Sequence, residues 1–245
     1  MTARQAQLSE ALARVQARLA AAAAAAGRAP GDIELLPVTK FHPAADVAVL
    51  ARLGCRGVGE SREQEAARKV SDVDHLLPGN EIRWHMIGRI QRNKARAVTS
   101  WAAVAHSVDS AELLAALGAG SATALHNGQR SAPLGVYVQL SLDGDPARGG
   151  VPLDQRPEVD RLCAAAEQTG GLRFLGLMAI PPAGADPEPQ FARLSAEYER
   201  VSAQFGRRLG LSAGMSSDLE MAVKYGSTCV RVGTALLGPR PLTSP

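Results

Sequence analysis

A lysine follows a short apolar run near the start of the chain, and lysine is the residue type that forms a Schiff base with aldehydes. The run reads IELLPVTKFHP from Ile33 to Pro43 and places Lys40 at the end of a predicted strand. Because its neighbours are apolar, we expect desolvation to lower the pKa of Lys40 and to favour the nucleophilic neutral amine. The alternative is that Lys40 only marks where the strand leaves the core, since a lysine charge is costly to bury.

The scarcity of lysine narrows the choice of nucleophile. Only four of the 27 basic residues are lysines. Lys69 and Lys94 fall within polar predicted helices and Lys224 near the end of another. Arginine is always protonated and does not serve as the amine. The sequence therefore favours Lys40 as the one residue placed for a Schiff base.

Two later segments are candidates for binding the phosphate of an aldehyde cofactor. In GMSSDLEMA, Ser216 or Ser217 followed by Asp218 can begin a helix, and free backbone N–H groups at a helix start suit an anion. In RVGTALLG, Gly233 allows close backbone approach and Thr234 adds a hydroxyl. Each segment also has a plain interpretation, as an ordinary helix start and an ordinary strand end.

Arg231 lies two residues before Gly233 in the last predicted strand, where alternation can point its side chain into the fold. A buried guanidinium requires an acceptor. The ring nitrogen of a bound heterocycle is one candidate, and an internal carboxylate is the other.

The elements that must position these residues alternate regularly along the chain. Short apolar or β-branched segments predict eight strands, at 33–39, 55–60, 83–88, 102–109, 135–141, 174–180, 210–216 and 229–236. Helical patterns lie between them, at 44–54, 62–70, 91–99, 111–124, 153–170, 186–210 and 218–226. Before the first strand, Leu8, Leu12, Val15 and Leu19 follow helical spacing and predict an amphipathic helix, although an Ala- and Arg-rich transit peptide is an alternative.

This alternation, in 245 residues, predicts an α/β protein, a single (β/α)8 TIM barrel. The predicted domain covers residues 1–245 and ends in a short tail from about 239 to 245. An open doubly wound sheet is the rival, but it typically has a glycine-rich first turn, which is absent here. In such barrels the residues at strand C-terminal ends form the site, so Lys40 would stand at the mouth.

Composition and charge exclude several classes of protein. Hydrophobic residues make up 46% of the chain and charged residues 21%, yet no apolar run is long enough to span a membrane. Cys55, Cys163 and Cys229 are scattered without metal-ligand spacing, which favours a reducing cytoplasm and no metal site. The net charge of +3 is too small to indicate a nucleic-acid-binding protein. One basic stretch, GRIQRNKAR at 88–96, leaves a nucleic-acid-binding module as a minor alternative.

Several stretches taken together resemble the pyridoxal-phosphate homeostasis proteins, the YggS-like family. They are LLPVTKFHP, GVGESREQEA, RWHMIGRIQRNKAR, HSVDS, LSLDGDPARGGV, GLMAI and LSAGMSSDLEMAVKYGSTCVRVGTALLG, which extend over almost the whole chain. Members of this family resemble the N-terminal barrel of alanine racemase standing alone, and they bind pyridoxal 5'-phosphate (PLP) through the lysine of the first strand. The resemblance therefore implies that Lys40 carries PLP as a Schiff base.

The resemblance also implies roles for the later segments. It places Ser216, Gly233 and Thr234 around the phosphate, with Met215 nearby, and Arg231 against the pyridine nitrogen. One motif departs from the family pattern. The second strand usually ends in Gly-Glu-Asn, whereas here Ser61 stands in the place of the asparagine, so its hydroxyl replaces at most part of the amide contact.

Whether bound PLP would do chemistry is a separate question. PLP acts best as an electron sink when its ring nitrogen is protonated, and a neighbouring arginine opposes that protonation. In alanine racemase one catalytic base is a tyrosine from the second domain of the partner subunit. The sequence ends at Pro245 without such a domain, and Tyr137, Tyr198 and Tyr225 offer no clear replacement.

We therefore expect a non-catalytic PLP carrier or buffer in vitamin B6 and amino-acid homeostasis. The alternative is a weak PLP-dependent amino-acid racemase with Lys40 as its sole base. The expected partners are PLP and PLP-dependent apoenzymes, with no nucleic acid and no membrane. We also expect a cytoplasmic monomer.

Overall fold

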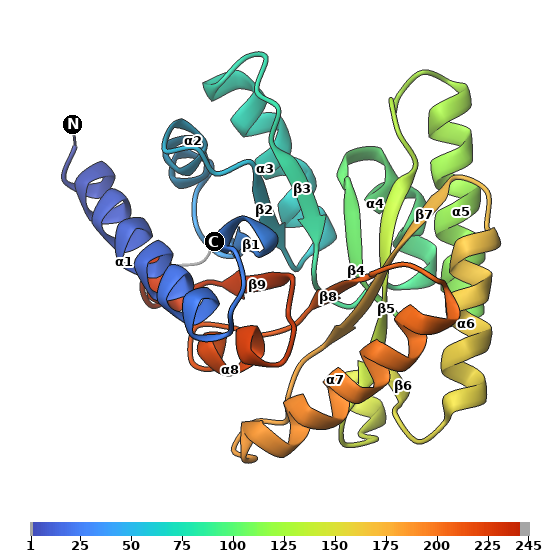
Figure 1. Cartoon of the computed structure of the whole chain (residues 1–245). Coiled ribbons are helices and arrows are strands. Elements are labelled where there is room, and N and C mark those ends of the chain that lie inside the picture. Colours follow the sequence, from blue (N-terminus) through green and yellow to red (C-terminus); the bar gives the residue numbers. More distant parts are fainter. Residues whose placement is uncertain (1, 241–245) are drawn as a thin grey trace.

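The computed structural model describes residues 2–240 and arranges them as a ring of parallel strands surrounded by helices (Figure 1). Eight strands form the ring: β1 Glu34–Pro37, β2 Gly57–Glu60, β3 Arg83–Met86, β4 Val104–Val108, β5 Leu134–Ser141, β7 Leu172–Ala179, β8 Gly210–Ser212 and β9 Cys229–Val232. Their hydrogen-bonded order is β1-β9-β8-β7-β5-β4-β3-β2. A bridge between Val38 and Gly59, continued by the Thr39 N–H donating to the Gly59 carbonyl at 2.9 Å, joins β1 to β2. The ring is thereby closed, and the predicted (β/α)8 fold is confirmed.

The strand ends near the predicted phosphate segments differ from the sequence prediction. β8 ends at Ser212 rather than at residue 216, because Gly214 adopts φ 92°, a left-handed conformation that a strand does not accommodate. β9 ends at Val232, and Thr234 begins a short helix instead of continuing the strand. A two-residue strand, β6 (Val151–Pro152), was not predicted and pairs with β5 outside the ring.

The helices follow the predicted alternation with some shifts at their ends. Their bounds are α1 Ala3–Ala25, α2 Ala44–Arg52, α3 Glu63–Leu76, α4 Ala95–Trp101, α5 Ala111–His126, α6 Arg156–Gln168, α7 Pro187–Gln204, α8 Leu219–Lys224 and α9 Thr234–Leu237. Three 3-10 helices accompany them: η1 Pro30–Asp32, η2 Arg92–Lys94 and η3 Pro146–Arg148. The helix predicted over 91–99 therefore begins only at Ala95, after η2.

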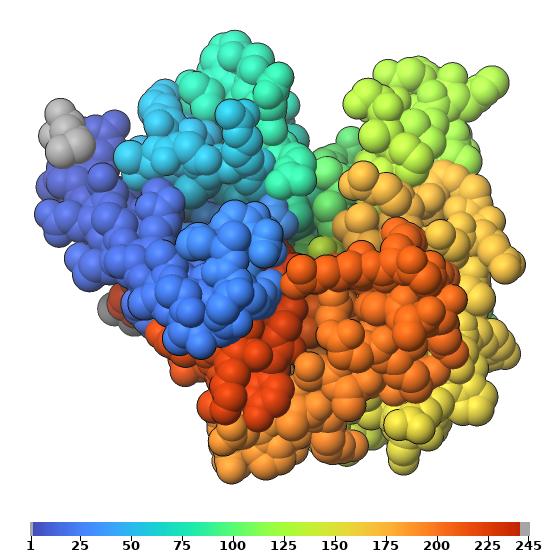
Figure 2. All heavy atoms as spheres, in the orientation of Figure 1, coloured from blue at the N-terminus to red at the C-terminus, as the bar shows by residue number. Residues whose placement is uncertain are grey.

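The amphipathic N-terminal helix is confirmed. The four apolar positions predicted to form its inner face are all buried, and a Thr2 capping box begins the helix. Ion pairs dock it at both ends: Arg4 binds Asp46 of α2 at 2.5 Å, and Arg18 binds Glu220 of α8 at 2.9 Å. In the space-filling view this blue helix lies against the red segments near the C-terminus (Figure 2). Helix α1 thus packs against α8 and α9.

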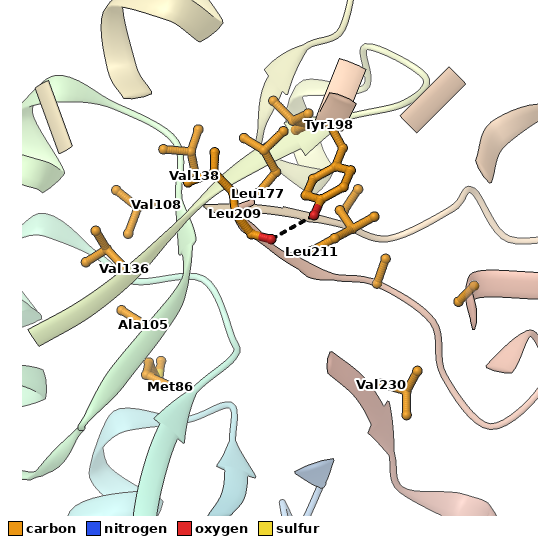
Figure 3. Close-up of a cluster of buried hydrophobic side chains, with 14 of the residues drawn as sticks. Met86, Ala105, Val108, Val136, Val138, Leu177, Tyr198, Leu209, Leu211 and Val230 are labelled. Atoms are coloured by element: carbon orange, nitrogen blue, oxygen red, sulfur yellow. Dashed lines mark hydrogen bonds between the residues drawn. The ribbon is translucent and has the colours of Figure 1, made fainter. Parts of the chain in front are cut away.

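The hydrophobic core lies mainly between the strands and their helices. Figure 3 shows apolar side chains that successive strands contribute to it, including Met86, Ala105, Val108, Val136, Val138, Leu177, Leu211 and Val230. Tyr198 of α7 packs there, and its hydroxyl donates to the Leu209 carbonyl at 2.8 Å. A second cluster, Val47, Val58, Val73 and Trp84, fills the space between β2, β3 and the helices α2 and α3. Because the apolar side chains lie in the layer between strands and helices, strand positions that face the barrel interior can carry polar groups.

The structure also bears on two features considered from the sequence, membrane-spanning helices and metal sites. Within residues 2–240 no helix combines the length and the apolar character needed to cross a membrane. In the same part of the chain no group of three or more His, Cys, Asp or Glu is arranged to hold a metal ion. Residues 241–245 of the predicted C-terminal tail lie outside the described residues.

Candidate functional site at the barrel mouth

Lys40 lies just past the C-terminal end of β1, at the mouth of the barrel. Its side chain is exposed, so the burial expected from its apolar neighbours is wrong. The reason is a sharp turn: Phe41 adopts φ 67°, and its ring lies 5.9 Å from the Lys40 Nζ. The chain thus leaves the core at Thr39, which is fully buried, and projects Lys40 outward.

The buried lysine is Lys69, which the sequence placed on a polar helix surface. Its side chain is only 6% exposed and reaches from α3 to the end of β1. The Lys69 Nζ donates to the Thr39 carbonyl at 2.8 Å and to Glu60 Oε1 at 2.7 Å, and it lies 3.3 Å from Glu65 Oε1. We call these four residues, Thr39, Glu60, Glu65 and Lys69, the Lys40 clamp. Sequence reasoning missed the clamp.

The segments after β8 and β9 meet near the end of β1, the strand that leads to Lys40. The Ala235 N–H donates to Ser216 Oγ at 3.3 Å, which joins the loop after β8 to the start of α9. Gly233 lies beside Val38 of the closing bridge, since a Cβ built on Gly233 would be 3.6 Å from the Val38 carbonyl oxygen. Thr234 is exposed, whereas Met215 and Ser216 are half-buried. Four of the predicted cofactor-binding residues therefore gather at one side of the mouth.

The helix predicted to begin near Ser216 starts slightly later. Asp218 is the cap of α8, and its Oδ1 accepts from the Met215 N–H at 2.5 Å instead of from the helix. The Arg231 N–H donates to the Gly214 carbonyl at 2.9 Å and ties the same loop to β9. These bonds give the 214–218 loop a defined shape.

Arg231 lies inside the barrel, as strand alternation predicts, and is 4% exposed. Its Nη1 donates to Ser212 Oγ at 2.6 Å and its Nη2 to the Ala179 carbonyl at 3.0 Å. Burial lowers the pKa of Arg231 from its ordinary value. Its protein acceptors are thus a hydroxyl and a carbonyl, and the internal carboxylate considered from the sequence is not among its partners in residues 2–240.

A buried chain of hydrogen bonds continues from Arg231 through the barrel. His106 Nδ1 lies 2.8 Å from Ser212 Oγ, and His106 Nε2 lies 2.9 Å from His85 Nδ1. Burial lowers the pKa of His85 to about 3 and that of His106 well below 6.5, so both imidazoles are neutral near pH 7. We call His85, His106 and Ser212 the histidine–serine chain. Sequence reasoning missed this chain, although each of its residues lies within a predicted strand.

Ser61 lies apart from the segments after β8 and β9. It follows β2, is half-buried and lines a cavity of about 1120 Å³, together with Phe41, Glu65, Lys69 and Met86. Within the described part of the chain its hydroxyl makes no hydrogen bond to another predicted site residue. This cavity opens beside Phe41, next to the clamp.

The basic stretch at 88–96 does not form one continuous surface helix. Arg89 lies in the loop after β3, Arg92 and Lys94 in η2, and Arg96 in α4. Lys94 lies 3.7 Å from Glu63. Arg89 and Lys94 nevertheless line the same cavity as Ser61.

A ring of eight parallel strands with an exposed lysine after the first strand and a buried arginine in the last defines a class of barrel. The sequence matches the family described as "Alanine racemase, N-terminal domain" over residues 11–241. It is 57% identical over 248 residues to the pyridoxal phosphate homeostasis protein of Mycobacterium bovis, with 99% of this chain and 96% of the relative covered. The chain therefore belongs to the pyridoxal phosphate homeostasis proteins within the alanine racemase N-terminal domain family.

Solved structures agree with this assignment. PipY of Synechococcus elongatus with PLP bound is 32% identical, with 95% of this chain and 100% of that chain covered and a TM-score of 0.77. The alanine racemase of Streptomyces coelicolor A3(2) is 20% identical, with a TM-score of 0.70, and the match covers 95% of this chain and 58% of that enzyme. At that identity the likeness to the racemase shows the fold alone.

Proposed function

We propose that this protein binds PLP through a covalent link to Lys40 and acts as a non-catalytic PLP carrier or buffer. The observation that carries the proposal is the position of Lys40 just past β1, the strand that pairs with β9, whose following Gly233–Thr234 turn lies against Val38 and is joined to Ser216. The structure of PipY with PLP bound, which shares this fold, supports the choice of ligand. An exposed amine suits a carrier, because the ligand can be accepted and released without opening a closed site.

The residues present fit the chemical groups of PLP. Ser216 and Thr234 offer hydroxyls, and the backbone around Gly233 offers N–H groups, all of which suit a phosphate. Arg231 offers guanidinium N–H groups for a ring nitrogen, and Met215 borders the same loop. PLP supplies a reactive aldehyde when bound. Ser61, at the end of β2, is assigned to the cofactor's other side, where a hydroxyl replaces the family's amide.

The tyrosines support the non-catalytic part of the proposal. Tyr137 is buried inside the barrel against the His106 ring, and burial raises its pKa. The Tyr198 hydroxyl donates to the Leu209 carbonyl within the core, and the Tyr225 hydroxyl donates to Glu188 at 3.0 Å. All three phenols of the chain are thus engaged or buried, and an acid/base pair across Lys40 would need a different group.

We further propose that the protein acts as a monomer in the cytoplasm and delivers PLP to PLP-dependent apoenzymes, without a nucleic-acid or membrane partner. The scattered thiols support a reducing compartment, since Cys163 and Cys229 are buried and Cys55 half-buried as free cysteines. Burial raises the pKa of Cys55 to about 11, which makes it a poor nucleophile.

Borohydride trapping tests the link to Lys40. Purified protein is mixed with PLP, reduced, digested and mapped by mass spectrometry. We expect one label, on the peptide that contains Lys40, and none after Lys40→Ala, while Lys94→Ala labels as the unchanged chain does. A label on another lysine, or no label, would overturn the proposal.

Incubation of the PLP-loaded protein with single amino-acid enantiomers in deuterated water tests the absence of catalysis. A carrier leaves the optical activity unchanged. Rapid loss of optical activity with deuterium uptake at the α-carbon would replace the carrier by a racemase.

A further inference from the structure

The two peptide units on either side of Lys40 are held by side chains from outside β1. On the N-terminal side, Lys69 donates to the Thr39 carbonyl at 2.8 Å, and the Thr39 hydroxyl donates to Glu60 Oε1 at 2.6 Å. On the C-terminal side, Glu65 Oε1 accepts from the Phe41 N–H at 2.7 Å. Lys40 therefore sits between two neighbours that are both anchored to α3, and Thr39 is also bound to Glu60 at the end of β2.

The anchor on Phe41 holds an unfavourable backbone conformation. Phe41 has φ 67°, the only positive φ of a non-glycine residue in the described part of the chain. Such a conformation in a bulky residue persists only when surrounding contacts hold it. Glu65 supplies a charged acceptor to its N–H, and the guanidinium groups of Arg62 and Arg240 lie 5.1 Å and 3.9 Å from the ring. The turn that projects Lys40 outward is thus stabilised from several directions.

Lys69 links both anchors. Its ammonium touches Glu60 and Glu65 as well as the Thr39 carbonyl, so one buried cation joins the groups that hold residues 39 and 41. Glu60 is fully buried, and its Oε2 has no partner among the described residues. An ion pair that only stabilised the fold would not need to lie near Lys40. The Lys69–Glu60 pair, in contrast, contacts the backbone next to this predicted nucleophile.

We propose that Lys69 and Glu65 are positioning residues, which fix the backbone from which the Lys40 amine reaches PLP. The inference rests on the proposed function for the identity of the ligand. Lys69 and Glu65 touch the peptide units beside Lys40 and have no contact with its amine. Their loss should therefore slow the reaction of Lys40 without moving it to another lysine.

The first test measures the rate at which PLP attaches to Lys40, from the growth of its visible absorption. We expect Lys69→Met and Glu65→Ala to slow attachment by about tenfold, the effect of a lost charged hydrogen bond. Glu65→Gln should stay near the rate of the unchanged chain, because its amide oxygen can still accept from the Phe41 N–H. Lys94→Met is the matched control: it removes a lysine from another Lys–Glu pair on the same cavity, which has no bond to residues 39–41.

The second test separates positioning from folding. The double variant Lys69→Met/Glu60→Gln removes the buried carboxylate charge together with its partner, so it should be more stable than Lys69→Met alone. If its attachment rate stays low while its thermal stability recovers, Lys69 acts through position. If attachment recovers in step with stability, or if Lys94→Met slows it equally, the inference is wrong.

A third measurement needs no cofactor. Hydrogen exchange of the Phe41 amide, followed in the protein without PLP, should speed up in Glu65→Ala and Lys69→Met by about tenfold or more, and not in Glu65→Gln. Unchanged exchange would overturn the inference even if borohydride labels Lys40. Faster exchange in a protein whose Lys40 takes no label would instead refute the proposed function and leave the backbone anchor in place.

Discussion

Polar groups are buried at two places behind the barrel mouth, and they differ in charge. Between β1, β2 and α3, the Lys40 clamp places one ammonium against two carboxylates. Inside the barrel, the histidine–serine chain leads from Arg231 through a hydroxyl and two imidazoles that remain neutral near pH 7. The histidine–serine chain ends at Arg231, which is predicted to touch the cofactor. The clamp ends at the direct neighbours of Lys40.

Because one network is charged and the other is neutral, they should respond differently to substitutions and to acid. Removal of one ion from a buried pair leaves an uncompensated charge, whereas removal of one neutral group leaves only unpaired hydrogen-bond donors or acceptors. A charged network is therefore the more fragile one toward single substitutions. The neutral network should be the more sensitive to acid, because protonation would place a new charge where none is solvated.

The largest effect is expected from breaking the ion pair of the clamp. Lys69→Met should lower the free energy of unfolding by about 3–5 kcal/mol at pH 7, because Glu60 stays buried without its cation. Urea denaturation followed by circular dichroism measures this loss. Adding Glu60→Gln should recover part of it. If the two substitutions destabilise additively, the charges are not coupled and the contrast between the networks fails.

Acid should reveal the histidine–serine chain. Unfolded His85 takes up a proton below pH 6.5, whereas in the folded protein it does so only near pH 3. The unfolded state thus binds more protons in this window, and stability falls as the pH falls from 6.5 toward 3. From pH 7.5 to pH 5 the contribution of His85 alone should be a loss of about 2 kcal/mol.

His85→Gln is the control for this acid effect. It removes one titrating group and keeps a hydrogen-bonding side chain beside His106, so its stability should depend less on pH over the same range. Glu60 works in the opposite direction. Burial raises its pKa despite the opposing Lys69, so the folded protein holds this proton more readily, and Glu60 adds stability as the pH falls toward 4.5. An equal pH dependence in His85→Gln and the unchanged chain would show that the imidazole is not held neutral.

The sequence predicted the ring of strands because each strand is a local apolar segment with a helical pattern after it. It also predicted that Lys40, Ser216, Gly233 and Thr234 lie at strand ends, since chain order alone places them there. Their strand and helix limits were less accurate. Gly214 and Gly233 interrupt β8 and β9, and only the tertiary arrangement decides where such glycines end a strand.

The roles of the two lysines were harder to predict. The apolar run before Lys40 suggested burial, but the left-handed turn at Phe41 sends the Lys40 side chain outward. No local propensity predicts such a turn for phenylalanine. Lys69 stands in a polar helix, yet Ala66, Lys69 and Val73 are its buried positions. That spacing, three and then four residues apart, marks one helix face and was the available signal.

The smallest effect is expected from removal of a single hydroxyl from the histidine–serine chain. This change tests one neutral hydrogen-bonding group of that network without altering any charge. Ser212 Oγ lies between Arg231 and His106, so Ser212→Ala leaves two buried nitrogens without this partner. We expect a loss of about 1–1.5 kcal/mol in the free energy of unfolding, the net contribution of one hydrogen bond, measured by urea denaturation.

Ser202 is the matched control, because it is also buried but its Oγ has no partner among the described residues. Ser202→Ala should change stability by less than about 0.5 kcal/mol or increase it, since an unpaired hydroxyl gains nothing from burial. The two substitutions remove the same atom from two buried positions. A similar loss in both would mean that burial, and not the hydrogen bond to Arg231, determines the effect, and the histidine–serine chain would then not hold that guanidinium.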